Sequence, residues 1–163
     1  MKKISILLFL VGSLTSAQDG TKEAIATTLD TWHKAASNAE FDAYFDLMTT
    51  DAVFIGTDAM ENWNIPAFKA YSKPHFDKGK AWSFTAVERN IYVDEAQDFA
   101  WFDELLNTQM KLCRGSGVLR KTDKGWKIAH YVLSIAVPNE HVSELIAIKK
   151  DSDNSLLEKL SKN

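Results

Sequence analysis

Apolar residues recur at helical spacing between residues 21 and 40, in the segment TKEAIATTLDTWHKAASNAE. The apolar positions form one stripe and the charged residues lie off it, which is the pattern of an amphipathic helix. The stripe consists of Ile25, Leu29, Trp32 and Ala36. We therefore predict a helix that buries this stripe against the rest of the chain.

A second helix is predicted over residues 64–79, NIPAFKAYSKPHFDKG. Pro66 suits the first turn of a helix, because its missing N–H would lack a partner there anyway, whereas Pro74 should end or kink the helix late. The residues expected to face inward are Ile65, Phe68 and Phe76. Between the two helices, residues 41–50 predict a short helical turn and residues 51–58 a short strand.

From Trp82 onward the pattern changes to runs of β-branched and aromatic residues, which are typical of strands. Turn segments such as DEAQ and TDKG separate four long predicted strands. These strands cover residues 82–94, 98–109, 112–122 and 125–138. Asn139 suits the start of a final helix, and residues 151–163 are expected to form a looser polar tail.

This order of elements indicates an α+β fold, with helices on one face of a curved antiparallel sheet. The predicted strands carry apolar residues on both faces, so the second face also needs cover. Either the C-terminal helix or another copy of the chain could supply it. A homodimer through the outer face is expected on these grounds.

The N-terminal segment MKKISILLFLVGSLTSAQ has the pattern of a secretory signal peptide. Two lysines precede an apolar run that is too short to span a bilayer, and small residues precede Gln18. We expect residues 1–17 to be a signal peptide, residues 18–150 to form one domain, and the protein to be exported, periplasmic or secreted. No membrane insertion is expected after removal of the signal.

The net charge and the positions of cysteine and histidine indicate which partners and cofactors to expect. The formal charge is −3, and it becomes −5 without the two lysines of the signal. Without a basic cluster, nucleic acid is not an expected partner. Cys113 is the single cysteine, so no internal disulfide forms, and a buried thiol is expected. No histidines lie at metal-ligand spacing, so neither a metal nor another cofactor is predicted.

Asp103 and Glu104 stand side by side in the predicted strand segment WFDELL. Neighbours in a strand point to opposite faces, so Asp103 shares a face with Trp101, and Glu104 shares the other with Leu106. One acid is expected to pair with Arg114 of the next strand and the other to face the cavity, and the sequence leaves open which. An unpaired interior carboxyl would have a raised pKa and could transfer protons.

Two histidines extend this set of candidates. In the last strand, regular alternation places His130 on the same face as Trp126 and Ile128, either as a pocket base or as a buried histidine bonded to an acid. His33, beside Trp32 on the first helix, either faces the mouth of a cavity or lies exposed. The candidate catalytic residues are Asp103, Glu104 and His130.

Large aromatic residues come from separate predicted elements. If the fold gathers them, they line a cavity suited to a planar, mostly apolar molecule; the alternative is ordinary core packing. The candidate ligand-binding residues are Trp32, His33, Phe54, Trp63, Phe68, Trp82, Trp101 and Arg114.

The segments TWHKAA, AWFDELL, CRGSGVL and GWKIAHYVLSIAVPNE, within residues 21–148, resemble the SnoaL-like branch of the nuclear-transport-factor-2-like (NTF2-like) superfamily. The resemblance implies a cone-shaped α+β barrel with a deep pocket between the concave sheet face and the first and third helices. It also implies that the turn carrying Thr57, Asp58 and Glu61 lies near the pocket rim, where Asp58 contacts a ligand or only shapes the turn. The steroid-isomerase pattern is not met, because the first helix offers Trp32 and His33 where that enzyme type has a tyrosine.

Three functions fit these observations. The chain binds a small, mostly apolar molecule in an aromatic pocket, or it is an acid–base enzyme of the cyclase, isomerase or dehydratase kind. The third alternative is a dimerising interaction module without an active site, because the scaffold hosts all three.

Overall fold

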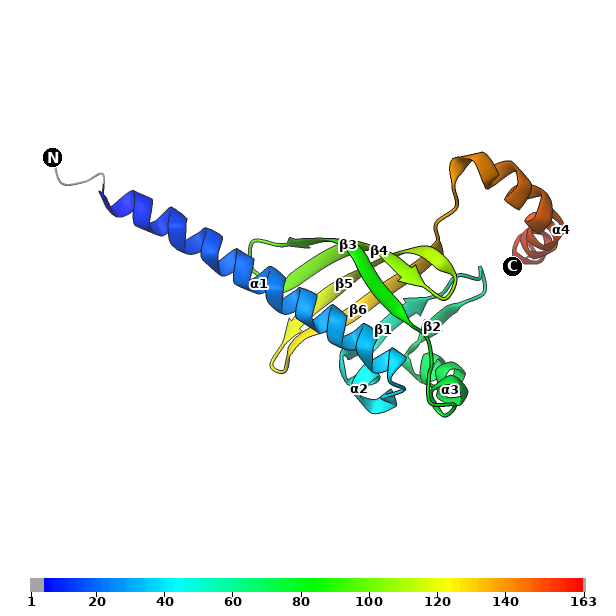
Figure 1. Cartoon of the computed structure of the whole chain (residues 1–163), viewed down its shortest axis with the longest axis horizontal. Helices are drawn as coiled ribbons and strands as arrows, with labels where there is room; N and C mark the ends of the chain where they lie inside the picture. Colours follow the sequence, from blue (N-terminus) through cyan, green and yellow to red (C-terminus); the bar gives the residue numbers. More distant parts are fainter. Residues whose placement is uncertain (1–4, 163) are drawn as a thin grey trace.

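The structure, a computed structural model of the chain, describes residues 5–162, and side chains from Gly20 onward (Figure 1). Four α-helices and six strands form within this range. In chain order the elements are α1 (Ser5–Ser37), α2 (Phe41–Asp46), β1 (Met48–Ile55), β2 (Asn62–Asn64), α3 (Ile65–Phe76), β3 (Phe84–Val93), β4 (Phe99–Thr108), β5 (Lys111–Thr122), β6 (Gly125–Ile135), the 3-10 turn η1 (Asn139–His141) and α4 (Val142–Leu160).

The strands form one sheet in the order β2-β1-β6-β5-β4-β3. All neighbouring pairs are antiparallel except β1 and β6, which run parallel. The predicted α+β class is confirmed, with helices on a strongly curved sheet (Figure 1). However, β2 and β3 do not pair with each other, so the sheet stays open and does not close into a barrel.

Helix α1 lies across the sheet and packs mainly on β3 (Figure 1). The predicted stripe is confirmed, because the side chains of Ile25, Leu29, Trp32 and Ala36 are all 0% exposed. Burying such side chains is the main favourable contribution to folding. This helix therefore forms one wall of the core.

Helix α3 begins where the sequence predicts. The Asn64 side chain caps it by accepting a hydrogen bond from the backbone N–H of Ala67 at 3.0 Å, and Pro66 lies in the first turn. The helix continues through Pro74 to Phe76, although a proline has no N–H to donate to the carbonyl four residues earlier. Phe68 and Phe76 are buried, as predicted.

Two bulges interrupt the regular alternation of strand faces. In β3, Ala86 pairs with Leu106 and Glu88 with Leu105, which leaves Val87 without a partner. An extra residue in one strand reverses the faces of all residues that follow it. Arg89 therefore turns inward and lies opposite Glu104.

The second bulge corrects the prediction for His130. Val118 pairs with His130 and Leu119 with Ile128, which leaves Ala129 without a partner. The alternation reverses there, so Tyr131 is buried at 0% exposed and His130 lies on the outer face. Strict alternation from the sequence placed His130 with Ile128, and the bulge is the physical reason for the difference.

The outer face of the sheet is not covered within the chain. Tyr92 and Trp101 are each 45% exposed there, and Phe99 is 41% exposed. Helix α4 projects away from the sheet and buries no residue (Figure 1). It continues to Leu160, so most of the segment predicted as a loose tail is helical.

Residues 1–4 of the predicted signal peptide lie outside the described residues, and the rest forms the beginning of α1. Among the residues that the structure describes, no helix combines the length and the apolar character needed to cross a bilayer.

Candidate functional site

Glu104 lies in the interior of the fold and is fully buried, in the middle of β4. Its Oε1 atom lies 2.7 Å from Nε2 of His33 on α1, and it accepts a hydrogen bond from the Tyr131 hydroxyl at 3.2 Å. Its Oε2 atom accepts a hydrogen bond from Nε of Arg89 at 2.9 Å. The carboxylate is thus held by three different elements.

Arg89 extends this cluster to the surface. Its Nη1 atom donates to Oδ1 of Asp30 at 2.8 Å and to the backbone carbonyl of Ala26 at 3.2 Å. Because both partners belong to α1, the guanidinium connects the first helix to the sheet. We call Glu104, His33, Arg89 and Tyr131 the buried acid cluster.

The environment of Glu104 determines its ionisation. Burial raises the pKa of this carboxyl, but the hydrogen bond and charge of His33, together with Arg89, outweigh burial and lower the pKa from its usual value. This differs from the raised pKa expected for an unpaired interior acid. Glu104 is a permanent anion near neutral pH, and a poor proton donor.

Asp103 points to the outer face, as the alternation predicts, and is partly exposed. Its Oδ1 atom lies 3.5 Å from Nη1 of Arg114 and accepts a hydrogen bond from the Asn90 amide at 3.2 Å. Asp103 is therefore the acid beside Arg114. Glu104 points inward, but it is buried among its partners and does not line the cavity that we describe next, which differs from the prediction.

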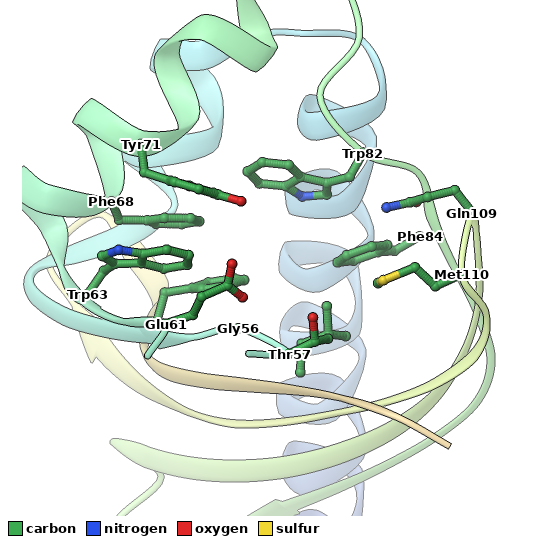
Figure 2. A pocket seen from close by; sticks show the side chains of 12 residues that line it. Gly56, Thr57, Glu61, Trp63, Phe68, Tyr71, Trp82, Phe84, Gln109 and Met110 are labelled. Atoms are coloured by element: carbon green, nitrogen blue, oxygen red, sulfur yellow. The ribbon is translucent and has the colours of Figure 1, made fainter. Parts of the chain in front are cut away.

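A cavity of about 160 Å³ opens at the end of the fold where α3, the β1–β2 turn and the β4–β5 turn meet (Figure 2). A cavity of this size matches one six-membered ring. Six of its twelve lining residues are aromatic. The lining residues are Phe54, Gly56, Thr57, Glu61, Trp63, Phe68, Tyr71, Trp82, Phe84, Gln109, Met110 and Leu133.

The aromatic walls pack on one another and hold the cavity in shape. The ring centroids of Phe54 and Phe68 lie 4.1 Å apart with an 18° interplanar angle, and those of Trp63 and Tyr71 lie 4.3 Å apart at 26°. Phe68 also stacks with Trp82 at 5.9 Å. The stacked rings border a partly open cavity, which suits a mostly apolar ring.

The polar groups of the cavity are few. Burial raises the pKa of the Tyr71 hydroxyl, and the nearby Glu61 carboxylate raises it further. Asp58 does not line the cavity, because its Oδ1 atom accepts a hydrogen bond from the backbone N–H of Met60 at 2.8 Å and shapes the turn. Of the two alternatives for Asp58, the structure shows turn formation.

The predicted ligand-binding residues divide into three groups. Phe54, Trp63, Phe68 and Trp82 line the cavity. Trp32 and His33 are buried beside it without lining it; Trp32 fills the interior between Tyr44 and Tyr131, with ring centroids 4.9 Å and 4.8 Å away. Trp101 and Arg114 lie on the outer face, 45% and 55% exposed.

Several important residues were not singled out from the sequence. Arg89 and Tyr131 were missed because regular alternation does not bring them to Glu104 without the bulges at Val87 and Ala129. The sequence did not indicate that Tyr71, Gln109 and Met110 line a cavity. Residues on a helix surface or in a tight turn are usually expected to face solvent.

The buried acid cluster and the cavity are neighbours without a shared opening. None of the four cluster residues lines the cavity. The Phe84 ring does line it, and its centroid lies 5.7 Å from that of the His33 imidazole. Phe84 therefore stands between the cluster and a molecule in the cavity.

The family comparison agrees with this architecture. The family model for the SnoaL-like domain matches residues 25–138, which include every strand of the sheet. The chain therefore belongs to the SnoaL-like domain family. A search of curated proteins by sequence found no match.

Solved structures with the same fold have diverse roles. A candidate dehydratase of the NTF2-like family from Streptomyces avermitilis is 14% identical, with a TM-score of 0.65 over 74% of this chain and 99% of that chain. A candidate aromatic ring hydroxylase from Novosphingobium aromaticivorans is 18% identical, with a TM-score of 0.64 over 73% and 91%. The association domain of CaMKII from C. elegans is 19% identical, with a TM-score of 0.59 over 72% and 98%. At these identities the similarity establishes the fold alone.

Within the described part of the chain, no group of three or more His, Cys, Asp or Glu side chains is arranged to hold a metal ion. Cys113 is buried, as predicted for a structural thiol.

Proposed function

We propose that this chain is an exported SnoaL-like protein that binds a small, mostly apolar, ring-containing molecule in its aromatic cavity. The observation that supports this most directly is the cavity of about 160 Å³ walled by Phe54, Trp63, Phe68, Trp82 and Phe84. Transfer of an apolar ring from water into such a space is favourable, because both the ring and the walls lose hydrated surface.

The acid–base alternative has less support from the geometry. A general acid or base must lie within hydrogen-bond reach of its substrate, whereas Phe84 separates the buried acid cluster from the cavity. Glu104 is also held in ion-pair contact with Arg89 at 2.9 Å. We assign the cluster a structural role, in which it ties α1 to the sheet.

We also propose that two copies associate through the outer sheet face. Tyr92 and Trp101 are cross-strand partners whose rings stack with centroids 5.6 Å apart, and both are half-exposed. Exposed aromatic surface of this kind marks interaction sites more often than ordinary surface does. The similarity of the fold to an association domain adds support for a second copy as the partner.

Native mass spectrometry of the protein purified gently from whole cells of its host tests these proposals together. We expect a homodimer of chains that begin at Gln18, with one small molecule per chain, or with benzyl alcohol bound when that probe is added. Failure to carry any small molecule or to take up benzyl alcohol would contradict the binding proposal. A monomer would contradict the dimer, and chains that begin at Met1 would contradict export.

A further inference from the structure

The cavity contains one carboxylate that the apolar character of its walls does not explain. Glu61 is the only residue with a formal charge among the twelve that line it, since the raised pKa keeps the Tyr71 hydroxyl neutral. Figure 2 shows the Glu61 carboxylate pointing into the cavity, between the rings of α3 and Thr57.

The turn between β1 and β2 holds this carboxylate in place. The backbone N–H of Gly56 donates to the Glu61 carbonyl at 2.9 Å, and the Glu61 N–H donates to the Asp58 carbonyl at 3.0 Å. Oε2 of Glu61 also accepts a hydrogen bond from the Asp58 N–H at 3.2 Å. A Cβ atom on residue 56 would lie only 2.1 Å from Oε2, so glycine is required for the carboxylate to lie over this turn.

The charge of Glu61 is not compensated by a neighbouring cation. Among the described residues, no Lys, Arg or His forms an ion pair with it. By contrast, the interior Glu104 has both Arg89 and His33. The Asp58 N–H and the Tyr71 hydroxyl are neutral donors, so a positioned carboxylate on the edge of the cavity, without a cationic partner among the described residues, can pair with a charged ligand.

Aromatic rings border Glu61 in the cavity. The faces of Trp63 and Tyr71 stack beside it, with ring centroids 4.3 Å apart, and Trp82 lies across the cavity (Figure 2). Trp63 and Tyr71 cover each other's facing sides, so these rings add apolar surface beside Glu61, and the preference for a cation comes from the carboxylate.

From this arrangement we infer that the ligand is a small organic cation, in which a protonated amine pairs with Glu61 and an apolar ring occupies the aromatic walls. The inference rests on the proposed function, because it assigns the chemical class of the molecule that the cavity binds. The ring supplies apolar burial, and the ammonium group donates to the carboxylate.

Three probes of equal ring size separate the contributions of ring and charge. Benzylammonium, benzyl alcohol and benzoate are each titrated at pH 7, and saturation is followed by tryptophan fluorescence. We expect benzylammonium to bind about tenfold more tightly than benzyl alcohol, since hydrogen bonds to charged groups are the stronger ones, and benzoate to bind most weakly.

Glu61→Gln is the decisive variant, because glutamine keeps the size and the acceptor oxygen but removes the charge. We expect benzylammonium affinity to fall about tenfold relative to that of benzyl alcohol in the same variant, and far-UV circular dichroism shows that the variant is folded. Glu95→Gln, at an exposed position in the β3–β4 turn, is the matched control and should leave all three affinities unchanged.

The possible failures are distinguishable. If benzyl alcohol or benzoate binds the unchanged protein as tightly as benzylammonium, or if Glu61→Gln keeps the preference for the cation, the inferred ligand class is wrong and the cavity proposal stands. If none of the three probes saturates, the proposed function and the inference are both overturned.

Discussion

Glu104 shows how one side chain can connect several elements. A fully buried carboxylate is costly unless it is paired, and here three side chains from α1, β3 and β6 contact it within 3.2 Å. The sequence suggested Glu104 as a catalytic residue. In the structure it lies where it stabilises the packing of α1 on the sheet.

Replacing Glu104 should reveal this structural role. We expect Glu104→Gln to reduce the free energy of unfolding by about 3–5 kcal/mol, because it removes the buried anion and leaves Arg89 with only the exposed Asp30 as an ionic partner. Asp103→Asn is the matched control one residue away; its partly exposed pair with Arg114 should contribute about 0–1 kcal/mol. Urea denaturation measures both, and equal small losses would contradict the assignment.

The lowered pKa of Glu104 gives this contribution a defined pH dependence. The carboxyl is more acidic in the folded chain than in the unfolded chain, where its pKa is about 4.3. The stabilisation is therefore complete above that value and is lost as the pH falls through the folded pKa. Between pH 7 and pH 3, the unfolding free energy of the original chain should decrease more steeply than that of Glu104→Gln.

At the scale of the element, the bulges in β3 and β6 decide which residues meet. The hydrophobic pattern correctly predicts α1, α3, the four long strands and the opposite faces of Asp103 and Glu104. It cannot locate a bulge, because one extra residue leaves the composition of a strand unchanged but reverses its faces. The inward positions of Arg89 and Tyr131 are the result.

Strand β5 accommodates this arrangement through Gly115. A Cβ atom at this position would lie 2.3 Å from the Tyr131 hydroxyl oxygen and 3.1 Å from Cγ of Glu104. The glycine in the segment CRGSG thus provides space for the buried acid cluster.

Gly115→Ala should therefore destabilise the protein by about 1–3 kcal/mol, as overpacking of a core does. Gly20→Ala is the control, because Gly20 is exposed on α1 and a Cβ atom there would meet no neighbouring side chain within 4 Å; that change should alter the stability by less than about 0.5 kcal/mol. Tyr131→Phe in the Gly115→Ala background should cost less than the two single changes together, which thermal denaturation can measure. Additive losses would show that the hydroxyl is not the obstacle.

At the scale of the whole molecule, the sheet separates two surfaces with different roles. The inner face buries the acid cluster and leaves the aromatic cavity at one end, and the outer face exposes Tyr92 and Trp101. The sequence did not distinguish these two surfaces, because it shows only that aromatic residues are abundant. Trp101 and Trp63 were therefore both predicted to bind a ligand. The curvature of the open sheet places only Trp63 at the cavity.

The side chains of the cavity also come from segments that are distant in the chain. Glu61 lies in the β1–β2 turn, Tyr71 on α3 and Gln109 beyond the end of β4. Their convergence depends on how the turns at this end of the sheet approach α3, which no local pattern encodes. The fold was therefore more predictable than the site.

The most direct test of binding in the cavity is an NMR titration that follows the five tryptophan indole N–H signals as benzyl alcohol is added. We predict saturable shifts for Trp63 and Trp82, which line the cavity, and none for Trp101 on the outer face or for Trp126. The absence of any saturable shift at Trp63 and Trp82, or a largest shift at Trp101, would contradict the assignment of the cavity as the binding site.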